Sequence, residues 1–169
     1  MNPDYKFCPR CAASLEVLPL GGRQRTACTA CGFTHWNNPL PVVAAIIEYQ
    51  GQIVLARNAA WPPKMFALIT GFLEAGETPQ QGIAREVEEE TSLVATQVSL
   101  VGVYEFIRKN ELIIAYHVQA EGEIKLSEEL VDYKLVAPAD LRPWKMGTGL
   151  ALADWMRARN LPFEFLERP

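Results

Sequence analysis

The chain has 169 residues, of which 49% are hydrophobic and 21% are charged, and its formal net charge is −4 at pH 7. This length fits one hydrophobic core with a small appendage, and the composition argues against a largely disordered chain. The acidic balance argues against a general nucleic-acid-binding protein, which usually carries a basic stripe.

The N-terminal residues give the first indication of the compartment. Residues 1–10 contain no apolar core of the kind that marks a secretory signal peptide. The longest apolar run, Pro41 to Ile47, is far shorter than the about 20 residues that a membrane-spanning helix needs. We therefore expect a cytoplasmic protein with no membrane partner.

All four cysteines lie before residue 32, in two CxxC pairs: Cys8 with Cys11, and Cys28 with Cys31. Zinc takes four ligands in a tetrahedron, whereas a disulfide framework is typical of secreted proteins. The pattern predicts a structural Zn²⁺ site in a zinc ribbon of residues 1–36, because so short a segment cannot build a core alone. Redox chemistry is the alternative, and His35 is not needed as a ligand because four thiolates suffice.

The same segment raises the question of nucleic acid. Arg10, Arg23 and Arg25 give the expected ribbon some positive charge. An RNA-directed enzyme, with the ribbon holding the RNA, is therefore one alternative function. The acidic total and the lack of clustered aromatic residues in this segment argue against strong nucleic-acid binding.

A turn at Asn37-Asn38-Pro39 marks the start of a second domain, residues 37–169. Its apolar, β-branched run Val42–Ile47 predicts a buried strand, and Gln50-Gly51 predicts a hairpin turn. Further strands are expected at 52–57, 65–70, 98–108, 111–120 and 130–137, and helices from Thr78 to Glu90 or Thr91 and at 148–159. This mixture predicts an α/β fold in which helices cover a mixed sheet.

The first of these helices carries an acidic cluster. Thr78-Pro79 is a helix-start signal, and Glu86, Glu89 and Glu90 then fall within about 100° of one another around the axis. Like charges at this spacing repel, and the C-terminal end of a helix disfavours negative charge. The cluster therefore indicates a bound cation, and carboxylate ligands favour Mg²⁺ or Mn²⁺. A solvated acidic face is the alternative.

The stretch from Gly71 to Leu93 resembles the Nudix box, Gly-x5-Glu-x7-Arg-Glu-U-x-Glu-Glu-x-Gly-U, where U is a bulky aliphatic residue. Ser92 stands where the family usually has glycine, at a position expected to be left-handed, where serine costs about 1 kcal/mol. A zinc ribbon before such a box is similar to the NADH pyrophosphatase branch and related zinc-ribbon Nudix hydrolases. The matching positions are Gly71, Glu77, Arg85, Glu86, Val87, Glu89, Glu90 and Leu93.

The resemblance implies a Nudix-type α/β/α sandwich that hydrolyses the pyrophosphate bond of a nucleoside diphosphate linked to another group. Within the family pattern, the acidic cluster holds divalent ions against the diphosphate. Arg85 and Glu77 orient that cluster, and Gly71 lets the backbone approach the ligand.

The resemblance also implies a catalytic carboxylate from a loop downstream of the box. Glu129 is the first candidate and Glu128 the second, although simple surface charge explains either equally well. Glu89 or Glu129 is expected to take the proton from a water molecule that the metal has acidified.

The organic half of the substrate is less constrained by the sequence. NADH-specific members carry Ser-Gln-Pro-Trp-Pro-Phe-Pro after the box, and residues 101–106 lack it, so ADP-ribose or FAD is favoured over NADH. Tyr104, Phe106, Trp61 and Phe66 are candidates for stacking on a base, with core packing as the alternative.

Two alternatives concern the protein as a whole. A binding or regulatory protein that has lost turnover is possible on this fold, but the intact set of acidic ligands favours an enzyme. Related enzymes are often dimers, so a homodimer is expected. His117 is expected to be a packed histidine rather than a catalytic one.

Overall fold

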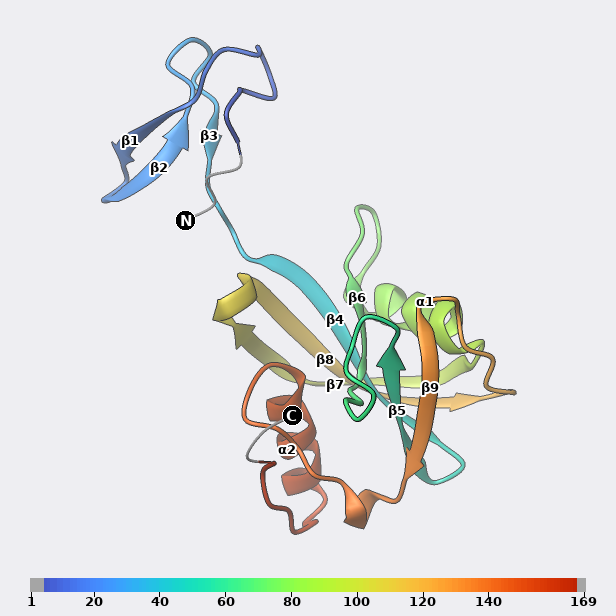
Figure 1. The fold of residues 1–169 in the computed structure, drawn as a ribbon. Coiled ribbons are helices and arrows are strands. Elements are labelled where there is room, and N and C mark those ends of the chain that lie inside the picture. The colour runs from blue at the N-terminus through green and yellow to red at the C-terminus, as the bar shows by residue number, and fades with distance from the viewer. Residues whose placement is uncertain (1–4, 167–169) are drawn as a thin grey trace. The chain divides into compact units, whose positions relative to one another are not determined.

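The computed structural model describes residues 5–166, and the chain forms two compact units that meet between Pro39 and Leu40 (Figure 1). The division lies beside the expected turn at Asn37-Asn38-Pro39. In the described part of the chain, no helix is both long enough and apolar enough to cross a membrane.

The first unit is built on a small antiparallel sheet in the order β1-β2-β3. Its strands are β1 (Glu16–Leu20), β2 (Arg23–Ala27) and β3 (Thr34–His35). Gly21 and Gly22 both have positive φ, 59° and 75°, and make the turn between β1 and β2. The sequence predicted a glycine-containing loop here but not the strands, which are short and largely exposed.

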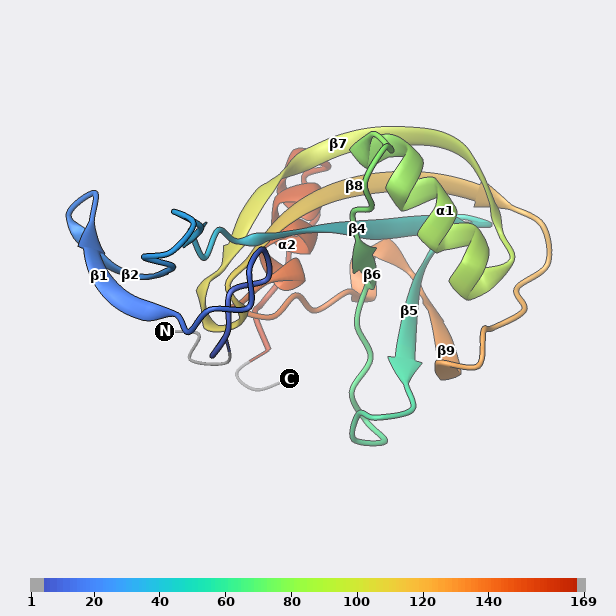
Figure 2. The same ribbon diagram turned by 90° about the horizontal axis from the view of Figure 1, so that it is seen from above.

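The second unit contains a six-stranded mixed sheet in the order β7-β8-β4-β5-β9, with β6 also paired to β4. Among the described strands of this sheet, β4 and β8 are the one parallel pair, and the other pairs are antiparallel. Figure 2 shows β4, β7 and β8 side by side, with β5 and β9 turned steeply away from them. The strands are β4 (Leu40–Tyr49), β5 (Gln52–Asn58), β6 (Ile69–Phe72), β7 (Val94–Phe106), β8 (Glu111–Glu121) and β9 (Leu130–Val136).

Two helices, α1 (Pro79–Thr91) and α2 (Thr148–Ala158), cover opposite faces of this sheet. Side chains of a strand alternate between its faces. Accordingly, Val43, Ala45 and Ile47 of β4 pack with α1, whereas Val42, Ala44 and Ile46 belong to the clusters that contain α2. Figure 1 shows β4, β7 and β8 between the two helices, which confirms the expected α/β/α sandwich.

Helix α1 begins and ends as the sequence predicts. Thr78 caps it: its hydroxyl accepts a hydrogen bond from the Gln81 N–H, and the Gln81 side chain accepts one from the Thr78 N–H. Pro79 occupies the first turn, where its missing N–H is not needed. At the other end Ser92 is left-handed, with φ 58°, and its N–H donates to the Glu88 carbonyl.

Two strands differ from the prediction. The strand expected at 65–70 corresponds to β6, which begins later, at Ile69, and includes Gly71. Within this segment, residues 69–72 are the ones that pair with β4. The preceding residues form a loop that touches β5 through an isolated bridge between Ala67 and Ala56. The strand expected at 98–108 starts at Val94 and ends at Phe106, where a 3-10 turn, Ile107–Lys109, follows.

Candidate active site

The four cysteines of the first unit come together. Their sulfur atoms lie within 4.8 Å of one another, with 3.5 Å between Cys8 and Cys31 and 3.6 Å between Cys11 and Cys28. Four sulfurs at about 2.3 Å from a tetrahedral zinc ion are about 3.8 Å apart, whereas a disulfide needs about 2 Å. The cluster therefore fits a four-coordinate metal ion and contains no disulfide.

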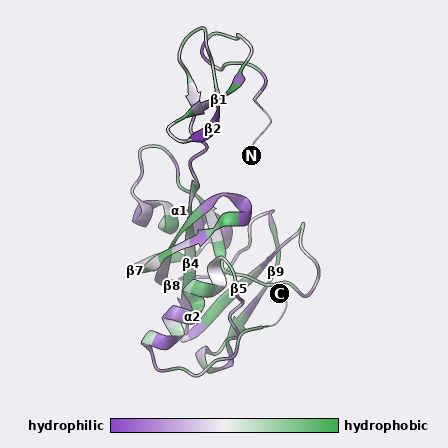
Figure 3. Ribbon diagram, turned by 90° about the vertical axis from the view of Figure 1, so that its left-hand side faces the viewer, coloured by the Kyte–Doolittle hydropathy of each residue, from purple (hydrophilic) through white to green (hydrophobic). Residues whose placement is uncertain are grey.

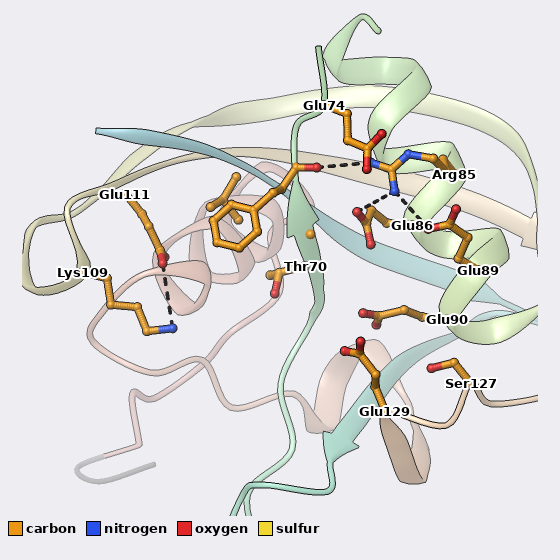
Figure 4. Close-up of a pocket in the computed structure, with 13 residues that line it drawn as sticks. Thr70, Glu74, Arg85, Glu86, Glu89, Glu90, Lys109, Glu111, Ser127 and Glu129 are labelled. Atoms are coloured by element: carbon orange, nitrogen blue, oxygen red, sulfur yellow. Dashed lines mark hydrogen bonds and ion pairs between the residues drawn. The ribbon is translucent and has the colours of Figure 1, made fainter. Parts of the chain in front are cut away.

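In the second unit, the acidic side chains of α1 line a cavity of about 560 Å³. Figure 4 shows Glu86, Glu89 and Glu90 projecting from α1, with the Glu129 carboxylate facing Glu90 from the loop before β9. Backbone hydrogen bonds fix that loop, because the Ser127 N–H donates to the Glu90 carbonyl and the Ala59 N–H donates to the Glu129 carbonyl. The structure thus brings the downstream carboxylate to the helical cluster, while Glu128 is absent from the cavity lining.

Arg85 holds the acidic side chains in place. Its Nε and Nη2 donate to the two oxygens of Glu77 at 3.1 and 2.9 Å. Its Nη1 donates to Glu86 at 2.8 Å and to Glu89 at 3.0 Å, and its Nη2 also reaches the Phe72 carbonyl. These contacts are what the orienting role expected of Arg85 and Glu77 requires.

The structure shows why a residue without a side chain is needed at Gly71, and the reason differs from the one expected from the sequence. A Cβ atom built on Gly71 would lie 1.8 Å from Cδ of Glu86 and 2.0 and 2.2 Å from its oxygens. The absence of a side chain therefore makes room for a carboxylate of the protein itself. The sequence-based expectation concerned the approach of a ligand to the backbone.

Burial and charge set the protonation of this cavity. Burial, with the charges of Glu86 and Glu129 nearby, raises the pKa of Glu90 to about 7. Burial also raises the pKa of Glu86, despite its contact with Arg85. The hydrogen bond from Arg85 lowers the pKa of Glu77. The cavity is therefore short of positive charge, which a divalent cation would provide.

The carboxylates suit hard cations, but they are less tightly gathered than the sulfurs. Among residues 5–166, the four cysteines are the only group of three or more His, Cys, Asp or Glu side chains gathered closely enough to hold a metal ion as the side chains stand. Glu86, Glu89, Glu90 and Glu129 share one cavity. Their assignment as ligands of Mg²⁺ or Mn²⁺ stays a prediction.

A second cavity, of about 390 Å³, shares Val42, Thr70, Lys109 and Glu111 with the first. Three of the aromatic residues singled out in the sequence, Trp61, Phe66 and Phe106, line it. Tyr104 lines neither cavity, and its hydroxyl donates to Asp154 of α2 at 2.9 Å. Burial raises the pKa of Tyr104, so this hydroxyl stays protonated.

Several lining residues were missed by sequence reasoning. Lys109 lines both cavities, and its Nζ lies 3.9 Å from Oε1 of Glu111. In the sequence, Lys109 was interpreted only as part of a turn. The Ser127 hydroxyl is buried in the lining of the acidic cavity without a hydrogen-bond partner. Trp144 and Met146, which follow β9, close the second cavity, and no local pattern marks them.

His117 is packed, as expected. Its Nε2 lies 2.7 Å from Glu48 and its Nδ1 lies 3.3 Å from Arg159. Burial lowers the pKa of His117. It lines neither cavity, so it has no place at the candidate site.

Comparison with known proteins relates this arrangement to one family. A NUDIX domain profile matches residues 38–155. The NAD-capped RNA hydrolase NudC of Vibrio cholerae is 32% identical over 96% of this chain and 53% of its own length. The protein of the same name from Mycobacterium tuberculosis is 31% identical over 69% of this chain and 37% of its own length. The chain thus spans about half or less of the length of these relatives.

Solved structures share the fold. A NUDIX hydrolase from Nitrosomonas europaea has a TM-score of 0.76 and 24% identity, covering 95% of this chain and 97% of its own. An ADP-ribose pyrophosphatase from Streptococcus suis has a TM-score of 0.58 and 19% identity, covering 76% of this chain and all of its own. At these identities the likeness concerns the fold alone.

Proposed function

Because the chain belongs to the Nudix family, we propose that it is a metal-dependent hydrolase that splits the diphosphate of a linked nucleoside diphosphate into two monophosphates. The observation that carries this proposal is the single cavity lined by Glu86, Glu89 and Glu90 of α1 and by Glu129 of a separate loop. Arg85 fixes two of these carboxylates, so the site is organised before substrate binds.

The residues divide the chemistry among them. Glu86, Glu89 and Glu90 are the ligands for Mg²⁺ or Mn²⁺, which supplies charge neutralisation and an acidified water when bound. Glu89 is engaged by Arg85, whereas Glu129 faces the cluster from the opposite wall. We therefore assign proton removal to Glu129 and metal binding to Glu89. Gly71 and Glu77 keep the carboxylates in position through Glu86 and Arg85.

The substrate is proposed to be an NAD-type dinucleotide, free or at the 5′ end of an RNA. The relatives carry the name NAD-capped RNA hydrolase, which gives the preference for ADP-ribose or FAD no support. The second cavity adjoins the acidic one and offers Trp61 and Phe106 to an aromatic base. Lys109 lines both cavities, and its ammonium group is our candidate for binding a substrate phosphate.

In the first unit, the four cysteines are proposed to bind a structural Zn²⁺ ion. The four sulfurs lie within 4.8 Å of one another and would occupy all four positions of a tetrahedral ion, so none would remain for a substrate. The unit therefore has no catalytic metal chemistry of its own.

A substrate panel tests the proposal. The purified 169-residue chain is incubated with Mg²⁺ or Mn²⁺ and with NADH, NAD-capped RNA, ADP-ribose, FAD or a diadenosine polyphosphate, and products are identified by mass spectrometry. We expect NADH or NAD-capped RNA to yield two monophosphate products. Tight binding without turnover of any member would instead indicate a regulatory protein, and turnover of ADP-ribose alone would contradict the substrate proposed.

A further inference from the structure

Charge is divided unevenly between the two units. Residues 1–39 carry four basic and two acidic side chains, a net charge of +2, whereas residues 40–169 carry 12 basic and 18 acidic, a net charge of −6. The acidic total therefore belongs to the second unit. Zn²⁺ on four thiolates adds a charge of about −2, so the zinc-loaded first unit is close to neutral. It therefore repels an anionic partner such as a phosphate chain less than the acidic second unit does, and its arginines can attract phosphates locally.

Aromatic side chains are exposed on the same small unit. Tyr5, Phe7 and Trp36 are 50%, 64% and 55% exposed, and Phe33 is partly buried. These rings were not expected to be available from the sequence, in which they do not form a cluster. Two of these rings lie against guanidinium groups, Arg10 on Phe33 at 5.5 Å and Arg25 on Trp36 at 4.8 Å.

The Arg25–Trp36 pair is fixed by its strands. Arg25 of β2 donates from Nη1 to the Trp36 carbonyl at 2.8 Å and from Nε to the Leu20 carbonyl at 3.3 Å. Arg23 lies two residues earlier on β2, so its side chain leaves the same face of the sheet. Figure 3 shows hydrophilic colouring on β2. Arg23, Arg25 and Trp36, here called the Trp36 face, thus combine an exposed ring with two cations.

An exposed ring next to guanidinium groups suits one kind of partner. Unpaired bases stack on aromatic rings and on guanidinium planes, while arginines bind the phosphates between them. Bases in a duplex are already stacked, so a duplex cannot use the ring in this way. We propose that the Trp36 face binds single-stranded RNA, with the Arg10–Phe33 pair as a further contact. The choice of RNA over DNA rests on the proposed function, whereas the contact itself does not require hydrolysis.

Fluorescence anisotropy of a labelled, uncapped, single-stranded RNA with the zinc-loaded full chain tests this proposal. We expect Trp36→Ala to weaken binding roughly tenfold or more, and Trp36→Phe to retain most of it. Arg23→Ala should make RNA binding less dependent on salt. The slope of log K against log salt concentration should become shallower by about 0.7, the value for one lost phosphate contact. Val17→Ala is the matched control, because Val17 is 64% exposed but pairs with Thr26 on the other face of the sheet.

Three outcomes would overturn the proposal: no RNA binding by the wild-type chain at low salt, binding only of DNA or of duplex, or unchanged affinity in Trp36→Ala. Light scattering is measured in parallel. A changed oligomeric state in Trp36→Ala with unchanged RNA affinity would assign this face to contacts between copies. Hydrolysis of NADH by the same samples reports on the acidic cavity alone, so its failure is distinguishable from failure of RNA binding.

Discussion

The two units of this chain are stabilised in different ways. In the described part of the first unit, the buried hydrophobic residues are Cys8, Ala27 and Cys28, so two of the three are thiol groups. The second unit has three apolar clusters on the two faces of its sheet. We therefore expect the first unit to depend on a metal ion bound by these thiols, whereas the second is stabilised by packing.

Removal of the thiolate site is expected to have the largest effect. Cys28→Ser, or a strong chelator, should unfold the first unit, because metal binding supplies most of its folding free energy. The second unit should keep its dispersed amide signals, since its core contains none of these cysteines. NMR amide dispersion measures both units in one sample. A first unit that stays dispersed without metal would show that it folds by packing.

Next in size is the effect of a methyl group at Gly71. Gly71→Ala places a Cβ atom on the Glu86 carboxylate, which must move away from the acidic cavity. We expect hydrolysis to fall roughly 10- to 100-fold, with little change in overall fold. Leu100→Ala, at a side chain that is 60% exposed on β7, serves as the control. Wild-type rates in Gly71→Ala would mean that the position of Glu86 is unimportant.

The pH dependence of metal binding is a smaller effect. The pKa of Glu90 is raised to about 7, so this carboxyl is protonated below that pH and must lose its proton to bind a cation. Mn²⁺ affinity should therefore rise with pH through 7, by at most about tenfold per pH unit for one proton. Titration calorimetry between pH 5.5 and 8.5 measures this, and Glu90→Gln should flatten the profile. An affinity that is independent of pH would contradict the role of Glu90.

The smallest expected effect concerns the end of α1. Ser92 is left-handed, a conformation that glycine adopts without strain. Ser92→Gly should raise the free energy of unfolding of the second unit by about 1 kcal/mol by removing this strain. The substitution also removes the hydrogen bond that the Ser92 hydroxyl donates to the Lys125 carbonyl, which reduces the gain. Urea denaturation measures it, and a destabilised variant would show that the hydrogen bond dominates.

The sequence predicted best what depends on neighbouring residues. Thr78 and Pro79 determine the start of α1 locally, and the spacing of the box put three carboxylates on one side of it. The start of β6 was missed because it depends on pairing with β4. The clash that explains Gly71 appears only when strand and helix are packed together.

The second cavity and the ribbon surface also depend on tertiary packing and could not be predicted from the sequence. Tyr104 looked like a base-stacking residue, but tertiary packing directs its hydroxyl to Asp154. Trp144 reaches the cavity from a segment after β9 that has no periodic pattern. On the ribbon, Arg25 and Trp36 meet only because β2 and β3 pair.

Helix α1 offers the most direct test of the proposed hydrolysis. Glu88 and Glu89 are neighbouring exposed residues of α1, but only Glu89 lines the acidic cavity. Because Glu89 is assigned as a metal ligand, steady-state hydrolysis of NADH with Mn²⁺ should fall roughly 100-fold or more in Glu89→Gln and stay near the wild-type rate in Glu88→Gln. Equal rates in the two variants would contradict the assignment of this carboxylate cluster as the catalytic centre.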